Sequence, residues 1–312
     1  MKKFSIVLPI YKNEENLPIT VPYILDNLKL FPEYETEIIM VCDGSPDKSY
    51  EVMKQFQSQH PDIIKIAKFV RNKGQRAAVN CGFTMASGDV IGVISADLQD
   101  PFEKFVDMLK LYEQGEKLVI GYREDREDKG LGSLFSVIMH KFINKHVNKQ
   151  YPAGGFDFYV VDRTIAEAFT KSDSDNNSMQ LLLLELAGHA AQIGVTRKKR
   201  EVGSSGWSLS KRIDQVLNIV TVYSDYPFRK FLSFGIFSGF VSLVFLVLSL
   251  VFYSSDFQLS IYMLLFFILF FLSAIVLGCA AMLGLYQYKA MRNEQRNPRY
   301  IVDERIPGEK DE

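Results

Sequence analysis

Hydrophobic residues are distributed unevenly along the chain. Residues 231–255 and 257–288 contain no Asp, Glu, Lys or Arg. Each run is longer than the roughly 20 apolar residues with which an α-helix crosses the hydrocarbon core of a bilayer. Two buried core helices are the alternative, but such helices rarely extend so far without a charge. We therefore predict two transmembrane helices, at about 231–254 and 260–286, within a segment spanning residues 230–288.

The rest of the hydrophobic pattern alternates between short apolar runs and segments of helical period. Apolar runs at 4–10, 37–42, 63–69 and 90–95 predict strands, with helices between them at 15–30, before 60 and at 74–86. Further strands are expected at 117–122, 158–161 and 191–195, and further helices at 129–149, 164–170 and 179–188. This alternation is typical of an α/β fold with a mostly parallel sheet and helices on both faces.

Basic residues flank the two apolar runs on their outer sides. Arg229 and Lys230 precede the first run, Lys289 and Arg292 follow the second, and residues 254–258 between them hold no Lys or Arg. The positive-inside rule then places both flanks in the cytoplasm. We expect a multi-pass protein of the cytoplasmic (inner) membrane with both termini in the cytosol. The predicted parts are a cytosolic domain at 1–205, juxtamembrane amphipathic helices at 206–229, the hairpin at 230–288 and a cytosolic tail at 289–312.

Overall composition excludes several classes of protein. The 36 Lys and Arg residues nearly balance 37 Asp and Glu residues, which argues against a generally basic nucleic-acid binder. Three scattered cysteines, Cys42, Cys81 and Cys279, predict neither a disulfide framework nor a zinc site. The four histidines are dispersed, and no nucleophile elbow surrounds a serine.

Oxygen-bearing side chains follow two of the predicted strands. Asp97, Gln99 and Asp100 come after the strand at 90–95, and Asp43 follows the strand at 37–42. Ordinary polar turns are one explanation for each. Ligands of open α/β sheets, however, bind beyond the carboxyl ends of the strands, and hard cations such as Mg²⁺ take oxygen ligands there together with substrate phosphates. Together the two turns favour a nucleotide and metal site.

Cations are concentrated in several predicted loops. Residues 71–76 (RNKGQR) form a basic loop that opens a helix, where backbone N–H groups favour anions. Arg123 and Arg126, the run 197–200, and Lys211 with Arg212 precede the predicted spans. They fit a phosphate site, although a solvated charged surface or attraction to anionic lipid are alternatives.

Five motifs together resemble one known family. They are residues 7–15 (VLPIYKNEE), 43–47 (DGSPD), 71–74 (RNKG), 96–101 (ADLQDP) and 155–158 (GFDF). In this order they resemble family 2 glycosyltransferases with a GT-A fold. With two C-terminal spans, the chain is similar to the polyisoprenyl-phosphate glycosyltransferases, the group of dolichol-phosphate mannose synthase and bactoprenol glucosyltransferase. The resemblance covers nearly the whole chain, and the ADLQ string is its most specific part.

The resemblance implies transfer of a sugar, with inversion, from a nucleotide sugar to a polyisoprenyl phosphate in the membrane. A UDP-linked glucose or N-acetylhexosamine is the expected donor and undecaprenyl phosphate the expected acceptor. It implies Mg²⁺ or Mn²⁺ held by Asp97 and Gln99, with Asp157 as the acid on the acceptor side. The implied donor-site residues are Pro9, Tyr11, Glu14, Asp43, Gly74, Arg76 and Asp97. The implied acceptor-phosphate residues are Arg123, Arg126, Arg200, Ser205 and Lys211.

The sequence also departs from the family pattern. Ser95 stands where the metal string usually begins with Asp, and Cys42 stands where the second turn usually has Asp. A catalytically inactive membrane scaffold is therefore one alternative. A processive polysaccharide synthase is the other, but the Gln-x-x-Arg-Trp string of those enzymes does not occur. The polar tail beyond residue 289 could reach a neighbouring subunit, which would make the protein a homo-oligomer.

Overall fold

The computed structural model describes residues 1–124, 140–145, 147–152, 155–172, 178–196 and 302–306, with isolated helical positions between 272 and 290. The chain divides into two compact units, one of Met1–Ser208 with Asn297–Glu312 and one of Leu209–Arg296. Apart from those isolated positions, both predicted spans lie outside the described residues. Within the described part, no helix combines the length and apolar character needed to cross a bilayer.

An eight-stranded sheet forms the centre of the first unit. Its spatial order is β7-β5-β6-β4-β1-β2-β3-β8. The strands are β1 Lys2–Ile10, β2 Tyr34–Cys42, β3 Ile64–Phe69, β4 Val90–Val93, β5 Leu118–Arg123, β6 Tyr159–Asp162, β7 Ala191–Val195 and β8 Val302–Ile306. Adjacent pairs among β3, β2, β1 and β4 are parallel, as are β5 and β7. Of the strands in the described residues, β6 and β8 run in the opposite direction. The expected mostly parallel α/β sheet of the GT-A fold is thus confirmed.

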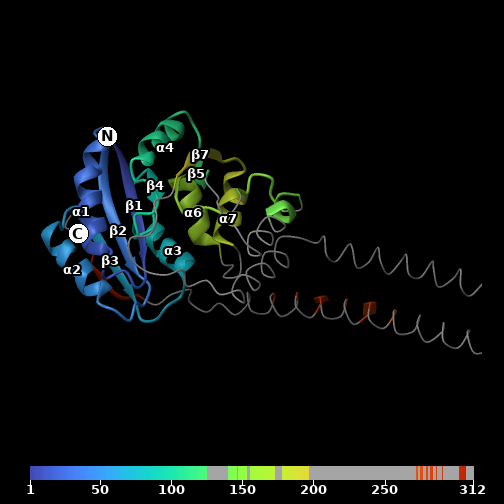
Figure 1. Cartoon of the computed structure of the whole chain (residues 1–312), viewed down its shortest axis with the longest axis horizontal. Helices are drawn as coiled ribbons and strands as arrows, with labels where there is room; N and C mark the ends of the chain where they lie inside the picture. The colour runs from blue at the N-terminus through green and yellow to red at the C-terminus, as the bar shows by residue number, and fades with distance from the viewer. Residues whose placement is uncertain are drawn as a thin grey trace, which may run out of the picture. The chain divides into compact units, whose positions relative to one another are not determined.

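Helices cover both faces of this sheet. They are α1 Leu17–Asn27, followed by the 3-10 turn η1 Leu28–Leu30, then α2 Ser49–Gln59, α3 Gln75–Met85, α4 Lys104–Glu113, α6 Arg163–Lys171 and α7 Met179–Ala187. Helices α1 and α2 lie on one side of strands β1–β3, and α3, α6 and α7 lie on the other (Figure 1). With both faces covered, β1 and β2 are apolar along most of their length, as strands buried on both sides require.

Aromatic side chains fill the core beneath α1 and α4. Phe4 on β1 packs edge-to-face against Phe31 and Phe105, with ring centroids 5.3 and 5.4 Å away. Phe105 also contacts Phe102 and Phe158, and Phe158 lies next to β6. Each of these rings is almost completely buried. Offset and edge-to-face pairs of this kind add to the stability that burial alone provides.

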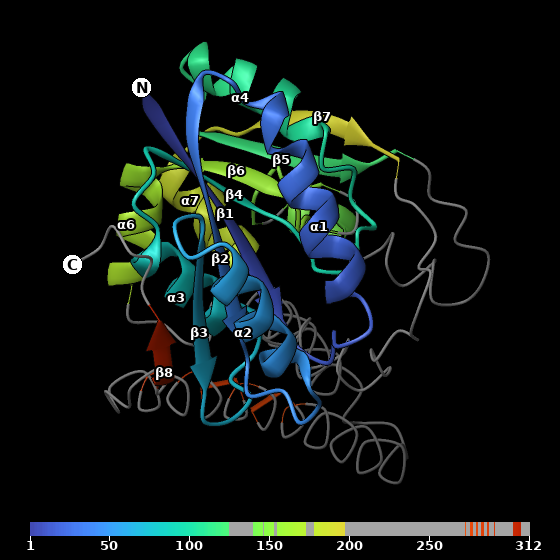
Figure 2. The same ribbon diagram turned by 90° about the vertical axis from the view of Figure 1, so that its left-hand side faces the viewer.

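Most predicted strands and helices lie within two or three residues of the observed ones. Helix α4 was not predicted, because its apolar positions fall in a charged segment just after the Asp97 turn. The predicted helix at 129–149 is described only in part, at residues 140–145. Strand β8 was not predicted either. It lies far along the chain from β3 but pairs antiparallel with it at the sheet edge (Figure 2).

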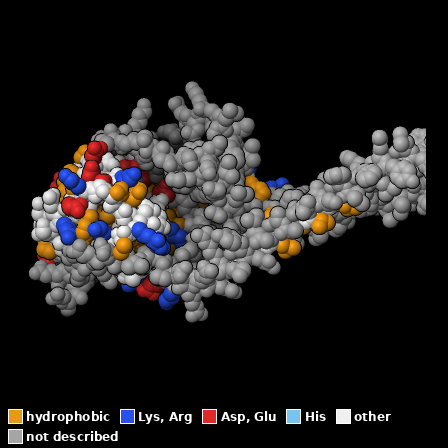
Figure 3. Space-filling model, turned by 90° about the horizontal axis from the view of Figure 1, so that it is seen from below, with side chains coloured by type: hydrophobic (Ala, Val, Ile, Leu, Met, Phe, Trp, Pro, Cys, Tyr) orange, Lys and Arg blue, Asp and Glu red, His pale blue; other side chains and the backbone are white. Residues whose placement is uncertain are grey.

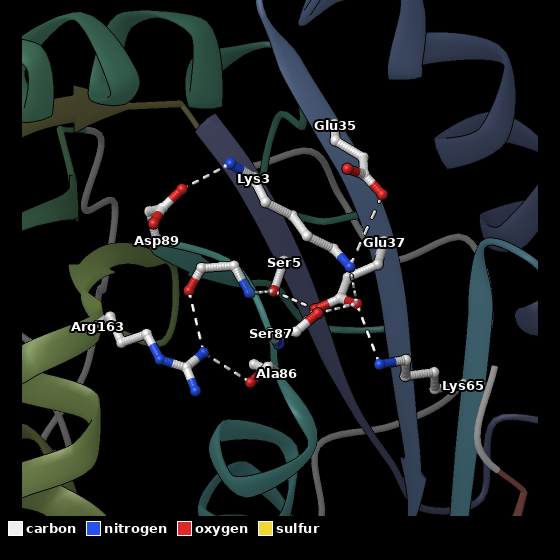
Figure 4. Close-up of polar contacts among 10 residues, drawn as sticks. Lys3, Ser5, Glu35, Glu37, Lys65, Ala86, Ser87, Asp89 and Arg163 are labelled. Atoms are coloured by element: carbon white, nitrogen blue, oxygen red, sulfur yellow. Dashed lines mark hydrogen bonds and ion pairs between the residues drawn. The ribbon is translucent and has the colours of Figure 1, made fainter. Parts of the chain in front are cut away.

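A buried ionic cluster lies near the amino-terminal ends of the parallel strands (Figure 4). Glu37 on β2 is 2% exposed and pairs with Lys3 at 3.0 Å and Lys65 at 3.3 Å. Its carboxylate also accepts hydrogen bonds from the Ser5 hydroxyl and from the Ser87 backbone N–H and hydroxyl. Both oxygens of the buried carboxylate therefore have protein partners in place of water, and these contacts join β1, β2 and β3.

The described surface visible in Figure 3 mixes Lys and Arg with Asp and Glu side chains. Exposed large hydrophobic side chains in the first unit include Ile19 and Val70. Such a mixed surface is normal for a folded domain and identifies no site by itself.

Candidate functional site

The carboxyl ends of β1, β2, β3 and β4 meet at one edge of the sheet, as the sequence predicted. In the ladder, Ile10 pairs with Cys42, Cys42 with Lys68, and Val7 with Val93. The loops that follow these strands therefore begin side by side. They contain residues 11–16, 43–48, 70–74 and 94–101, which include most of the predicted donor-site residues. Ligands of parallel α/β sheets bind at this kind of edge.

Two of these loops are joined by hydrogen bonds between backbone and side chains. The Lys12 N–H donates to Ser45 Oγ (2.8 Å), and the Asn13 N–H donates to Ser49 Oγ (2.9 Å). In the reverse direction, the Lys48 N–H donates to the Glu14 carboxylate at 2.7 Å. Glu14, predicted to belong to the donor site, thus has one oxygen engaged in holding the loop after β2. Pro9 lies at the end of β1, and the Tyr11 ring remains 42% exposed.

Asp43 joins the loop after β2 to the loop after β3. Its two carboxylate oxygens accept from the Lys73 and Gly74 N–H groups at 2.7 and 2.8 Å. Burial raises the pKa of Asp43, and these two hydrogen bonds only partly oppose that shift. Asp43 is 3% exposed. Whatever it contributes to ligand binding, this carboxylate determines where the basic 71–74 loop lies.

The adjacent Gly44 allows the loop after β2 to pack closely against the loop after β3. Gly44 has φ +58°, and a Cβ atom built there would lie 2.3 Å from the Arg71 carbonyl carbon. Only glycine combines that backbone conformation with so close an approach of a second chain segment. The Asp-Gly pair is therefore more than a turn signal, because it packs one loop of the site against another.

Asp97 lies on a tight turn directly beyond β4. Its Oδ1 accepts from the Ser95 hydroxyl at 2.5 Å and from the Gln99 N–H at 3.3 Å. Leu98 between them has φ +51°, a left-handed conformation uncommon for a non-glycine residue and frequent at functional turns. The Thr20 hydroxyl of α1 donates to the Ala96 carbonyl at 2.8 Å and so holds the turn against the domain.

The chemistry of this turn fits a hard divalent cation. Asp97 and Gln99 are partly exposed and supply only oxygen ligands, whereas Asp100 is 1% exposed. Ser95, in place of an acid, donates to Asp97 and orients its carboxylate. Among the described residues, no group of three or more His, Cys, Asp or Glu side chains could hold a metal ion. Two protein oxygens suit a cation such as Mg²⁺ that is bound jointly with phosphate oxygens.

Gly74 and Arg76 begin α3, at the end of the basic loop. Gly74 has φ +90°, which again favours glycine. The Arg76 guanidinium lies over the Phe169 ring of α6, 5.3 Å from its centroid. This cation–π contact orients Arg76 toward α6. The predicted role of Arg76 at the donor phosphates stays a prediction.

Asp157 belongs to a separate cluster just before β6. Gln180, near the start of α7, donates through Nε2 to the Phe156 carbonyl at 2.7 Å and, at a longer 3.4 Å, to Asp157 Oδ1. The Tyr151 hydroxyl donates to Gln180 Oε1 at 2.6 Å. Gly155 has φ +72°, and a Cβ there would lie 2.7 Å from the Gln180 amide oxygen. Gln180 and Tyr151 were not singled out from the sequence. A signal existed, since Gln180 is a polar residue in a helix of leucines.

Of the predicted acceptor-phosphate residues, Arg123 ends β5 with an exposed side chain. Arg126, Arg200, Ser205 and Lys211 lie outside the described residues. Their grouping around a phosphate therefore remains a prediction. The rest of the basic run at 197–200 also lies outside the described part.

Comparisons with known proteins identify the family. The family model "Glycosyl transferase family 2" matches residues 5–163, which span β1 through the start of α6. The chain is 30% identical over 305 residues to an undecaprenyl-phosphate 4-deoxy-4-formamido-L-arabinose transferase of Photorhabdus laumondii, covering 97% of this chain and 94% of the relative. A protein of the same name from Yersinia enterocolitica is 29% identical over 100% of this chain and 96% of its own length.

A solved structure is also similar at low identity. Glucosyl-3-phosphoglycerate synthase from Mycobacterium tuberculosis aligns with 17% identity and a TM-score of 0.49, over 70% of this chain and 78% of that chain. The family match covers half of the chain, and the motifs that it includes are those at the carboxyl edge of the sheet. The chain therefore belongs to glycosyltransferase family 2 and is a glycosyltransferase.

Proposed function

We propose that this enzyme transfers a sugar from a nucleotide sugar, of the UDP-linked class, to undecaprenyl phosphate at the cytoplasmic face of the membrane. The single observation that carries the proposal is the full-length similarity to curated relatives named as undecaprenyl-phosphate sugar transferases. That similarity extends through the two charge-free runs, and not only through the family 2 domain.

The arrangement of the described loops supports a donor site at the carboxyl edge. The joined loops after β1, β2 and β3 present Tyr11, Lys73 and Gly74 around one end of the sheet. The Asp97 turn follows β4, which pairs with β1. In this proposal the nucleoside lies against the first three loops. The sugar diphosphate extends toward Asp97 and Gln99, which would hold Mg²⁺ or Mn²⁺. A cation there supplies neutralisation of the charge that develops on the departing nucleoside diphosphate.

The nucleophile in this scheme is an oxygen of the lipid monophosphate. The second pKa of such a monoester is about 6, so the phosphate is mostly a dianion at neutral pH. A general base is therefore less necessary than for a sugar hydroxyl. We assign Asp157 to orienting the acceptor, and the attack inverts the anomeric carbon. Arg123, with Arg126, Arg200, Ser205 and Lys211, would counter the repulsion between the two phosphate groups.

The identity of the sugar is a separate part of the proposal. Glucose and N-acetylhexosamine are the donors expected from the motifs. The relatives' name adds a 4-deoxy-4-formamido-arabinose to the sugars to be tested. These candidates differ in ring substituents that single loops of a donor site can distinguish, because an unpaired buried hydroxyl or amide is costly.

Membranes that contain the protein can be incubated with a panel of labelled UDP-sugars and undecaprenyl phosphate, with and without EDTA. We expect one sugar to appear on the lipid, and EDTA to abolish the transfer. Label in a polymer would instead indicate a processive synthase. If no sugar reached the lipid, and no nucleoside diphosphate protected the protein against heat in the presence of Mg²⁺, an inactive scaffold would be the better reading.

A further inference from the structure

We propose that Gln180 of α7 is a positioning residue that holds the Gly155–Asp157 segment in its reactive arrangement. The inference rests on the proposed function, because Asp157 is taken there to orient the acceptor phosphate. Gln180 belongs to none of the motifs by which the family was recognised, and it reaches the segment from a different helix.

The hydrogen bonds of Gln180 set its orientation. The Tyr151 hydroxyl donates to Oε1 at 2.6 Å, while Nε2 faces the Phe156 carbonyl at 2.7 Å. A carbonyl oxygen can only accept, so the Phe156 contact requires the donor end of the carboxamide and excludes the flipped arrangement, whereas the Tyr151 hydroxyl could pair with either end. Nε2 consequently also points at Asp157 Oδ1, 3.4 Å away.

The same amide determines the shape of the backbone before Asp157. Gly155 occupies a left-handed conformation, and its missing Cβ leaves the space in which the Gln180 amide and Tyr151 hydroxyl meet. The short bond to the Phe156 carbonyl then fixes the peptide next to Asp157. Because the contact to Oδ1 is long, Gln180 acts mainly by holding the backbone.

Two of the residues around Gln180 are buried. Tyr151 and Phe156 are at most 7% exposed, and Phe156 packs edge-to-face on the fully buried Tyr159. Gln180 and Asp157 are partly exposed, but Phe156 is not, so water can replace the hydrogen bond to the Phe156 carbonyl only poorly and the segment would shift instead. A displacement of a reacting group by about 1 Å can lower a rate about 100-fold.

Two substitutions distinguish positioning from simple packing. Gln180→Met keeps the length of the side chain but removes its hydrogen bonds to Tyr151, Phe156 and Asp157. Gln180→Glu keeps the acceptor for Tyr151 but places an anion against the Phe156 carbonyl and Asp157. We expect kcat for transfer to undecaprenyl phosphate to fall at least tenfold in Gln180→Met and further in Gln180→Glu. KM for the nucleotide sugar should change less than twofold in both.

Asn27→Leu is the matched control. Asn27, at the end of α1, also donates an amide N–H to a backbone carbonyl, that of Tyr23, at 2.8 Å. This variant should lose thermal stability without losing kcat. If both Gln180 variants kept the wild-type kcat, or if Asn27→Leu lost kcat in the same proportion to its lowered Tm, the inference would be overturned.

Two further results separate the inference from the function on which it rests. If Gln180→Met does not fold, Tyr151→Phe removes a single hydroxyl and should still lower kcat about threefold, and an unchanged rate would contradict the proposal. A wild-type protein that transfers no sugar to any lipid phosphate would overturn the proposed function and the inference with it. Active wild type with unaffected variants would overturn the inference alone.

Discussion

At the scale of single residues, the side chains at the carboxyl edge of the sheet are of two kinds. Some are accessible to a ligand, and others hold the loops in place. Asp97 is partly exposed on a strained turn, whereas Asp43 is buried with both oxygens on backbone N–H groups. Both are aspartates that follow a strand, so the residue type alone does not distinguish them. Their exposure and hydrogen-bond partners distinguish them. In our proposal Asp97 binds the cation, and Asp43 holds the loop after β3 in position.

Asp97→Asn should lower sugar transfer at least about 100-fold, because the amide gives the cation a neutral ligand in place of a charged one. The rate that remains should depend less on Mg²⁺. Initial rates measured against Mg²⁺ concentration check this. The exposed Asp26 of α1 provides the control, since Asp26→Asn should leave the rate unchanged. Undiminished transfer by Asp97→Asn in the presence of EDTA would contradict the metal site.

Glu37 predicts how stability depends on pH. Burial raises its pKa, but hydrogen bonds from Ser5, Ser87 and Lys3 outweigh burial and hold the pKa at about 2, against 4.5 ordinarily. A depressed pKa means that the stabilisation is complete above about pH 4.5 and is lost as pH falls toward 2. The lowered pKa of Glu37 corresponds to about 3 kcal/mol by which the folded state stabilises the ionised carboxylate.

The Glu37→Gln variant tests this dependence. It should be less stable than the wild type at pH 7, and the difference should shrink as the pH falls from 4.5 to 2. Thermal unfolding midpoints of the full chain in detergent, measured across this range, check the expectation. Glu35→Gln is the control, because the Glu35 side chain is 52% exposed and 3.9 Å from Lys3. Such a surface pair is worth at most about 1 kcal/mol. Equal losses in both variants would contradict the role of Glu37.

At the scale of elements, the loops after the parallel strands form one joined unit. Asp43→Asn leaves a single acceptor oxygen for the Lys73 and Gly74 N–H groups. We expect the 71–74 loop to loosen, the Tm to fall, and the Kd for a nucleoside diphosphate to rise about tenfold through the loss of one buried hydrogen bond. Calorimetric titration with UDP in the presence of Mg²⁺ measures this. An unchanged Kd would mean that the position of the loop does not affect donor binding.

Strand β8 protects the edge of the sheet. It pairs with β3 from Ile66 to Phe69, and a bare β3 would present unpaired backbone groups to other chains. Ending the chain after Tyr300 should therefore speed hydrogen exchange of the β3 amides and increase aggregation. Ending it after Ile306 keeps the strand and is the control. Equal exchange in the two truncated proteins would show that β8 gives β3 no protection.

At the scale of the whole molecule, the charge-free runs predict firm attachment to the membrane. The protein should remain in the membrane pellet after washing with alkaline carbonate, because two apolar helices are not released by charge disruption. In inverted vesicles, protease should digest the family 2 domain, because the positive-inside rule places it on the cytoplasmic side. Release by carbonate, or protection in inverted vesicles, would contradict this topology.

Local pattern was sufficient to predict much of the fold. Residues 4–10, 37–42 and 63–69 are mostly apolar runs ended by turn residues, and each is a strand at nearly those bounds. The pairing of β8 with β3 could not be read in this way. It joins segments more than 230 residues apart, and a strand of mixed polarity carries no mark of its partner.

In the candidate site, too, some features follow from local sequence and others depend on the tertiary structure. The chain itself determined the α/β fold class and the motifs at the strand ends, because strand period, turn residues and short motifs depend on neighbouring residues. Tertiary structure alone decided that Asp43 faces the backbone of the 71–74 loop, that Arg76 lies over Phe169, and that Gln180 supports Asp157. The reason is physical. Each of these contacts depends on where two distant segments pack, and packing is settled by the complete fold and not by any one stretch of residues.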